Sequence, residues 1–209
     1  MASIFEQLNG ALAGVLDNVA ASVVQVRDES RGAGAGTIWH ADGLIITNAH
    51  VVQHGPLKVA LHDGRVLNAR VIARDDQRDL AALSIDARDL PTIQVGSARH
   101  LQPGQWVMAV GHPWGVTNAA TEGVLIGVGH QTELPGVHHD WIVADLHLRP
   151  GNSGGPLVDI NGRMIGVNTL MTGPGVGVAV SVDSVKEFLK GALGSSVAET
   201  VAPKASEFV

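Results

Sequence analysis

The sequence predicts an all-β fold in which two six-stranded antiparallel β-barrels are flanked by a short helix at each end. About a dozen short apolar runs of strand length alternate with turn residues along the chain. The 209 residues include 26 glycines but only 3% aromatic residues, a composition that suits many short strands joined by tight turns. The strand pattern breaks near residues 98–105, and this break divides the runs into two groups of six. A chain of this length can hold one large all-β unit or two small domains that share a core.

An amphipathic helix is expected over residues 2–20, ahead of the first strand. Its apolar residues recur at intervals of three and four, the spacing that places side chains on one helical face. They are Ile4, Phe5, Leu8, Leu12, Val15, Leu16 and Val19. Because this stripe is long relative to the strand that follows, we expect it to contact another copy of the chain. Packing of the whole stripe onto its own barrel is the alternative.

The strands follow in two groups, and Asp-Gly or Asn-Gly dipeptides between them are typical of hairpin turns. The first barrel, about residues 21–100, takes strands at 21–26, 36–40, 43–47, 57–61, 66–73 and 80–85. The second barrel, about residues 105–183, takes strands at 106–111, 121–128, 141–145, 156–158, 164–171 and 177–182. The dipeptides stand at residues 42–43, 63–64 and 161–162.

A short closing helix is predicted at residues 184–191, where Ser184 and Glu187 form a capping-box pattern. It completes a single protein domain over residues 21–191. Serine, alanine, glutamate, threonine and proline then replace the periodic pattern, so residues 192–209 are expected to be a flexible tail.

Charge and composition exclude several functional classes. The formal net charge of −6 argues against nucleic acid as a partner, because the chain has no basic stripe to replace counterions. The absence of cysteine excludes disulfides, thiol catalysis and cysteine-rich zinc sites. Neither a signal peptide nor a membrane span is visible near the N-terminus, where Asp17 interrupts the apolar residues. We therefore expect either a cytoplasmic protein or a chain whose leader has been removed.

Residues 150–156 (PGNSGGP) are the most informative segment for function. Glycines on both sides of Ser153 allow a sharply bent backbone that exposes the hydroxyl and directs neighbouring N–H groups into a common space. A serine needs a base to become a nucleophile, and His50 follows an apolar run earlier in the chain. Asp79 leads into the apolar run at residues 80–85 and is the candidate to orient the histidine. The chain order His, Asp, Ser is that of one class of serine hydrolases.

The chain resembles the trypsin-like serine proteases, and within them the HtrA-like (Deg) branch. Six blocks in the same order carry the resemblance, which spans about residues 15–190, nearly the whole chain. They are residues 34–37 (GAGT), 42–52 (DGLIITNAHVV), 79–81 (DLA), 109–115 (AVGHPWG), 150–157 (PGNSGGPL) and 162–169 (GRMIGVNT).

This resemblance implies a chymotrypsin-like fold with the catalytic site between the barrels. Ser153 is then the nucleophile, His50 the general base and Asp79 the residue that orients it. The predicted oxyanion hole comprises Gly151, Asn152 and Ser153, with the N–H groups of Gly151 and Ser153 as donors and Asn152 orienting the loop. Relatives commonly assemble as trimers. Many also carry PDZ domains after the protease domain, but the residues that follow the last predicted helix of this sequence are too few for one.

The fold also implies a pocket for the substrate side chain before the cleaved bond, lined by the segment before the nucleophile and by a facing strand. In this sequence the lining residues are His147, Leu148, Arg149, Asn168, Thr169, Leu170 and Met171. Neither segment contains an acidic residue, so cleavage after small or medium apolar residues is expected rather than after Lys or Arg. The chain departs from relatives at residues 144–150, ADLHLRP where TDAAINP is usual, and at residues 111–115, GHPWG where GNPFG is usual.

Other interpretations of the polar residues remain open. Asp75 and Asp76 are the rivals of Asp79, and we interpret both as solvated turn residues. His50 and His54 have the spacing of two zinc ligands on a helix, but the glutamate of the zinc-protease motif is missing. A looser cluster that could hold a metal comprises His138, His139, Asp140 and His147. We predict that the protein needs neither a metal nor a cofactor.

These observations predict a serine endopeptidase that acts on unfolded or exposed polypeptides through an acyl-enzyme, with a role in protein quality control. Its expected partners are polypeptide substrates and further copies of the chain, most simply in a homotrimer. Two alternatives differ in class. One is a catalytically silent peptide-binding or chaperone-like module on the same fold, and the other is an esterase or acyl transferase that uses the same acyl-enzyme.

Overall fold

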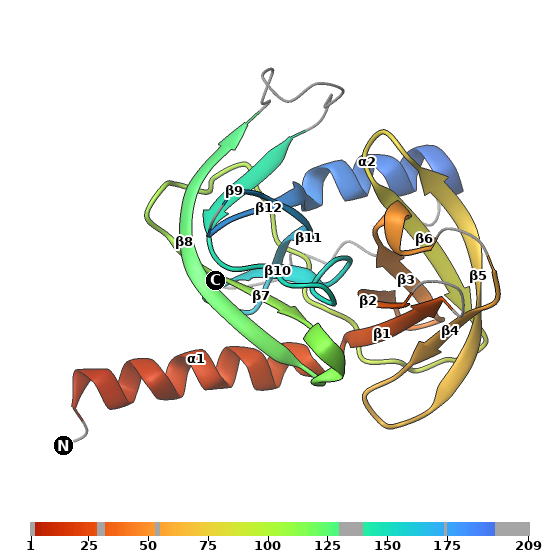
Figure 1. Cartoon of the computed structure of the whole chain (residues 1–209), viewed down its shortest axis with the longest axis horizontal. Coiled ribbons are helices and arrows are strands. Elements are labelled where there is room, and N and C mark those ends of the chain that lie inside the picture. Colours follow the sequence, from red (N-terminus) through yellow and green to blue (C-terminus); the bar gives the residue numbers. More distant parts are fainter. Residues whose placement is uncertain (1–2, 29–31, 53–54, 130–139, 174, 195–209) are drawn as a thin grey trace, which may run out of the picture.

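The computed structural model describes residues 3–28, 32–52, 55–129, 140–173 and 175–194, and these residues form two β-barrels and two α-helices (Figure 1). The first barrel closes in the order β1-β2-β3-β6-β5-β4 and the second in the order β10-β11-β12-β9-β8-β7, with every pairing antiparallel. The predicted all-β class and the two six-stranded barrels are confirmed.

All twelve predicted strands are present, each within a few residues of its expected bounds. The first barrel contains β1 (Val23–Asp28), β2 (Gly32–His40), β3 (Leu44–Thr47), β4 (Leu57–Ala60), β5 (Val66–Asp75) and β6 (Leu80–Ile85). The second barrel contains β7 (Trp106–Gly111), β8 (Ala119–Gly129), β9 (Trp141–Asp145), β10 (Pro156–Asp159), β11 (Met164–Gly173) and β12 (Val176–Ser181).

Three apolar clusters hold the fold together. One fills the first barrel around Ile38, Ile45 and Leu83, and another fills the second barrel around Leu125 and Ile142. The third is formed by residues of both barrels together with residues of both helices. Because this shared cluster joins the barrels, loops from both can meet at a fixed geometry.

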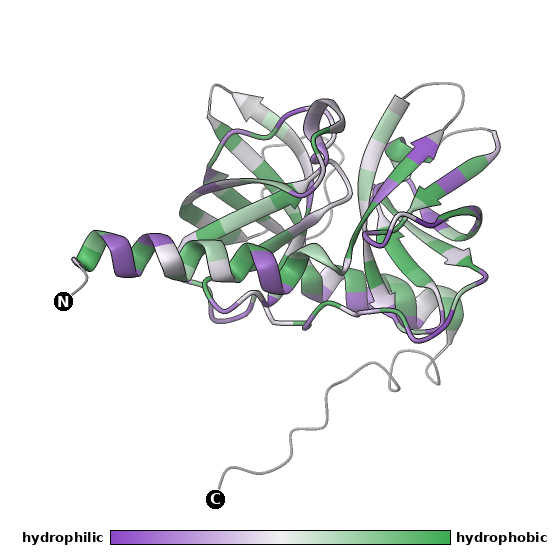
Figure 2. Ribbon diagram, turned by 90° about the horizontal axis from the view of Figure 1, so that it is seen from below, coloured by the Kyte–Doolittle hydropathy of each residue, from purple (hydrophilic) through white to green (hydrophobic). Residues whose placement is uncertain are grey.

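The helix α1 (Ile4–Ala20) begins with a capping box, in which the Ser3 hydroxyl accepts from the Glu6 N–H at 3.2 Å and the Glu6 carboxylate accepts from the Ser3 N–H at 2.6 Å. Its C-terminal half packs against the barrels through Val15 and Val19, whereas its N-terminal half projects away from them (Figures 1 and 2). Within the described residues, neither helix is long and apolar enough to cross a membrane.

The closing helix α2 (Val182–Leu193) begins two residues before the predicted start. Its N-cap is Ser181, whose hydroxyl accepts from the Ser184 N–H at 3.1 Å. The predicted cap, Ser184, therefore lies inside the helix, because the earlier serine already caps it by accepting from the Ser184 N–H. The helix also runs two residues past its predicted end at 191, so the tail does not begin at 192, and the predicted tail lies outside the described residues from residue 195 onward.

Candidate active site

His50 and Asp79 lie at the same end of two neighbouring strands. β3 ends at Thr47, and the 3₁₀ turn that follows it (Ala49–Val51) carries His50. Asp79 directly precedes β6, whose residue Ala81 pairs with Thr47. The pairing of β3 with β6 thus brings together two polar residues that are distant in the sequence.

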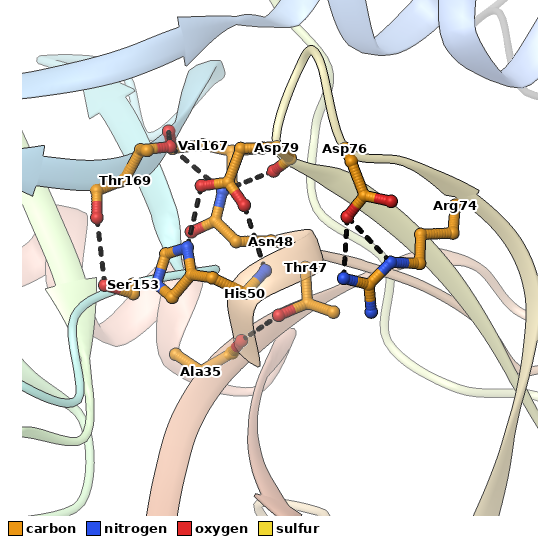
Figure 3. Close-up of polar contacts among 10 residues, drawn as sticks. All are labelled: Ala35, Thr47, Asn48, His50, Arg74, Asp76, Asp79, Ser153, Val167 and Thr169. Carbon is orange, nitrogen blue, oxygen red and sulfur yellow. Dashed lines mark hydrogen bonds and ion pairs between the residues drawn. The ribbon is translucent and has the colours of Figure 1, made fainter. Parts of the chain in front are cut away.

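Asp79 contacts His50 at two points (Figure 3). Its Oδ1 accepts from the His50 backbone N–H at 3.0 Å, and its Oδ2 lies 2.7 Å from the His50 ring atom Nδ1. Because an ionised carboxylate can only accept hydrogen bonds, Nδ1 carries the proton and Nε2 keeps its lone pair. Asp79 adopts a positive φ of 53°, a conformation in which aspartate is over-represented among non-glycine residues.

The two rival aspartates form ion pairs of their own. Asp75 accepts from the backbone N–H groups of Gln77 and Arg78 and pairs with the Arg78 guanidinium at 2.8 Å. Asp76 pairs with Arg74 at 2.6 Å, and this hydrogen bond lowers the pKa of the Asp76 carboxyl. Of the three aspartates, Asp79 is therefore the one that contacts His50.

Asn48 and Thr169 support this pair, and sequence reasoning gave neither of them that role. The fully buried Asn48 donates through Nδ2 to the Asp79 carbonyl and to the Thr169 hydroxyl, both at 2.9 Å. Thr169 lies on β11, so the contact ties the aspartate of the first barrel to the second barrel. The signal available in the sequence was the asparagine two residues before His50, but its partner lies 121 residues away.

Ser153 lies on the loop before β10 and faces His50 from the second barrel. In Figure 3 the imidazole of His50 lies between the Asp79 carboxylate and the Ser153 side chain. The Ser153 hydroxyl donates to the Thr169 carbonyl at 3.0 Å, and the backbone carbonyl of Ser153 accepts from the Ala35 N–H at 2.8 Å. The second of these bonds fixes the serine loop against β2 of the first barrel.

Residues 149–152 form a tight turn directly before Ser153. The Asn152 N–H donates to the Arg149 carbonyl at 2.9 Å, and the Asn152 side-chain oxygen accepts from the Arg149 N–H at 2.9 Å. Gly151 has a φ of +105°, and Pro150 cannot adopt a positive φ, so the turn is of type II. The N–H groups of Gly151 and Ser153 donate to no other group within the described residues.

The loop at residues 112–115 packs against this turn. The His112 N–H donates to the Gly151 carbonyl at 2.9 Å, and a Cβ on Gly151 would lie 2.5 Å from the His112 carbonyl oxygen. The His112 ring is buried and accepts from the Asn118 N–H at 3.2 Å. Burial lowers the pKa of His112 to about 4, and the nearby Arg27 and His62 act in the same direction. His112 is therefore neutral at physiological pH.

The residues predicted to line the substrate pocket fall into two groups. Asn168 and Leu148 are buried: Asn168 donates to the Pro156 carbonyl at 2.9 Å, and Leu148 joins the core of the second barrel. Thr169 is also buried, and its hydroxyl oxygen accepts from Asn48 Nδ2. His147, Arg149 and Met171 are exposed. The side chain of Leu170 lies outside the described part of the structure, so the pocket stays a prediction.

The alternative metal sites fall partly outside the described residues, so the geometry does not test them. Among the residues that the structure describes, no three His, Cys, Asp or Glu side chains are placed to hold a metal ion together. His54, His138 and His139, which the two candidate clusters require, lie outside the described residues.

Comparison with known proteins gives a consistent result. The family model of the trypsin-like peptidase domain matches residues 34–167. The DegP-like periplasmic serine endoprotease of Halomonas elongata is 41% identical over 143 residues, which cover 68% of this chain and 30% of that protein. The serine protease HTRA1 of Xenopus tropicalis is 35% identical over 193 residues, which cover 85% of this chain and 42% of that protein. The chain thus spans less than half the length of these curated relatives.

Solved structures of the HtrA-type protease AlgW have the same fold. The structure with a tripeptide superposes with a TM-score of 0.81 at 30% identity and covers 88% of this chain and 64% of that chain. The structure with a decapeptide gives a TM-score of 0.77 at 27% identity and covers 85% of this chain and 66% of that chain.

Proposed function

This chain belongs to the trypsin-like peptidase domain family, and we propose that it is an HtrA-type serine endopeptidase that cleaves unfolded or exposed polypeptides. The observation that carries the proposal is the two-point contact between Asp79 and His50, with Ser153 on the other side of the ring. His50 is held in the tautomer that can accept a proton from a serine hydroxyl. The peptides in the AlgW structures support a polypeptide substrate.

In the proposed reaction, Ser153 Oγ attacks the carbonyl carbon of the peptide bond while His50 Nε2 takes the hydroxyl proton. The C–N bond of the tetrahedral intermediate then breaks, His50 returns the proton to the leaving amine, and an ester on Ser153 remains. A water molecule then attacks the ester in the same way, with His50 again as the base. The ester bond breaks, the peptide leaves with a new carboxyl group, and the Ser153 hydroxyl is restored. Asp79 orients the ring throughout and stabilises its charged form.

The Ser153 hydroxyl must turn before it reacts. It donates to the Thr169 carbonyl at 3.0 Å, so its proton is directed away from His50. Catalytic hydrogen bonds are often misaligned in unliganded enzymes and shorten only when substrate is bound. A rotation about the Cα–Cβ bond of Ser153 moves the hydroxyl without moving the backbone that Ala35 and the 149–152 turn hold.

The N–H groups of Gly151 and Ser153 are the proposed donors to the oxyanion that forms on the substrate carbonyl. Both are without another acceptor within the described residues, whereas the Asn152 N–H is engaged with Arg149. Asn152 therefore orients the loop rather than donating to substrate. A single donor of this kind is worth about 3–4 kcal/mol in the transition state.

The test is labelling with a fluorophosphonate probe together with cleavage of casein. The wild-type chain should be labelled at Ser153 and should degrade casein, whereas Ser153→Ala and His50→Ala should do so at less than about a hundredth of the rate. Ser84→Ala changes a serine at the opposite end of β6 from Asp79, where Ser84 pairs with Leu44 of β3, and serves as the matched control. A chain that binds casein without cleaving it would instead be the catalytically silent module.

Self-association through α1 is the second part of the proposal, with a trimer as the expected state. Ile4 is 73% exposed, Phe5 78% and Leu8 40%, although all three continue the apolar stripe that packs onto the barrels further along the helix. Contact with further copies of the chain would remove this apolar surface from water.

A further inference from the structure

Two loop segments meet beside the proposed oxyanion hole. They are the 112–115 loop, which carries Trp114, and the 149–152 turn, which begins at Arg149. The centre of the Arg149 guanidinium lies 5.4 Å from the centroid of the Trp114 ring, within the range of a cation–π interaction. No step of the proposed reaction requires either side chain.

We propose that Trp114 is a positioning residue for the 149–152 turn: its indole packs on Arg149 and holds the turn in the type II conformation that presents the Gly151 N–H to substrate. The inference rests on the proposed function, because it assigns Trp114 to the machinery of the same reaction.

The first argument is that the loop and the turn already touch along their backbones. The His112 N–H donates to the Gly151 carbonyl, and a Cβ on Gly111 would lie 2.7 Å from that same carbonyl oxygen. With no side chain between them, a shift of the loop must move the turn. The 112–115 loop is therefore placed to set the orientation of the Pro150–Gly151 peptide.

The second argument is the unusual state of Trp114 itself. It is 74% exposed, and its φ of 53° is uncommon for a bulky residue and strained. The core gains nothing from this side chain, so packing of the fold does not account for its position. Its partner in the structure is Arg149, and contact with that residue is what the strained backbone achieves.

The third argument is that Arg149 cannot move without the turn. Its N–H and its carbonyl are both bonded to Asn152, which is 2% exposed. A guanidinium held against the indole thus fixes the first residue of the turn, while the Asn152 bonds fix the last. An exposed cation–π pair supports an effect of about two- to fivefold on an equilibrium between turn conformations.

The experiment compares substrate turnover with the affinity for a peptidyl aldehyde of the same sequence, whose hemiacetal carries an oxyanion. Trp114→Ala should lower kcat about two- to fivefold, leave KM unchanged and weaken aldehyde binding by the same factor, because only the charged tetrahedral state uses the Gly151 N–H. Trp114→Phe keeps an aromatic face and should stay within about twofold of the wild type. Val116→Ala, in the segment that follows the same loop and 58% exposed, is the matched control and should have no effect.

A double-mutant cycle separates positioning from other roles. Arg149→Ala should reproduce the effect of Trp114→Ala, and the double variant should be no slower than either single variant, because both remove the same contact. The inference would be overturned if the two single effects on kcat multiplied in the double variant, if kcat were unchanged, or if KM rose at constant kcat. Arg149→Ala alone decides the matter if Trp114→Ala does not fold. If the wild-type chain neither reacts with fluorophosphonate nor cleaves casein, the proposed function is refuted as well. If the wild-type chain is active and Trp114→Ala has the same kcat, only the positioning role is refuted.

Discussion

Replacement of Asp79 by asparagine should nearly abolish activity while leaving the fold intact. The carboxylate makes two contacts with one residue, to the backbone N–H of His50 at 3.0 Å and to ring atom Nδ1 at 2.7 Å. An asparagine in the same place has one oxygen that accepts and one nitrogen that donates. It can satisfy the backbone N–H only by directing its amide nitrogen at the ring.

The consequence follows from the tautomers of imidazole. A ring that accepts from the asparagine at Nδ1 carries its proton on Nε2, and Nε2–H cannot take a proton from Ser153. The opposite amide orientation restores the right tautomer but sets two N–H donors against each other at the His50 backbone, which costs about 1–3 kcal/mol. The first orientation therefore prevails, and kcat should fall by about 10⁴-fold.

The assay is hydrolysis of a chromogenic peptide by Asp79→Asn, with the thermal midpoint measured on the same preparation. Asp76→Asn is the matched control, because Asp76 pairs with Arg74 and does not touch His50. The control should retain wild-type kcat. If Asp79→Asn keeps more than about a hundredth of the activity, the assignment of Asp79 as the orienting residue is refuted.

Three further outcomes are expected. Gly151→Ala should lower kcat about 10²- to 10³-fold, as measured by kinetics on the purified variant. A Cβ at φ +105° would lie 2.5 Å from the His112 carbonyl oxygen, so the turn must change conformation and direct the residue 151 N–H away from substrate. The free energy of unfolding should fall as the pH drops from about 6.5 to 4, by up to about 3 kcal/mol, since burial lowers the pKa of His112 to about 4 and the unfolded chain binds the proton first. Urea titrations across that pH range should show this component in the wild type and not in His112→Asn. Phe5→Asp should dissociate the oligomer in light scattering, because it places a charge on the 78% exposed apolar end of α1, whereas Asn9→Asp on the same helix should leave the mass unchanged.

Strand positions were predictable because apolar runs in this chain end at turn residues. β6, β7 and β9 have their predicted bounds, since each is an uninterrupted run of mostly buried residues. β2 is longer than predicted because its glycine-rich start pairs with β1, and backbone hydrogen bonds need no side-chain pattern. An alternation of apolar side chains cannot reveal a strand that begins with glycines and alanines.

The proposed catalytic residues could be identified as motifs, but the residues that hold them could not. His50, Asp79 and Ser153 each stand next to a strand in a recognisable local pattern. The Asn48–Thr169 hydrogen bond joins the two barrels, and neither partner carries a local sign of the other. Pairing of this kind depends on how closed barrels face each other, which is a property of the packed structure.

The contact between Trp114 and Arg149 shows why two sequence departures that look independent have a common explanation. Considered along the chain, Arg149 alters the substrate pocket and Trp114 is a mild change in a distant loop. β7 and β10 pair in antiparallel fashion, however, so the loop that follows β7 must lie beside the loop that precedes β10. A larger ring on one loop and a planar cation on the other are complementary only in that arrangement. If Trp114 has the proposed positioning role, the departure at Arg149 acts on the oxyanion side of the site, and the apolar preference expected before the cleaved bond does not depend on it.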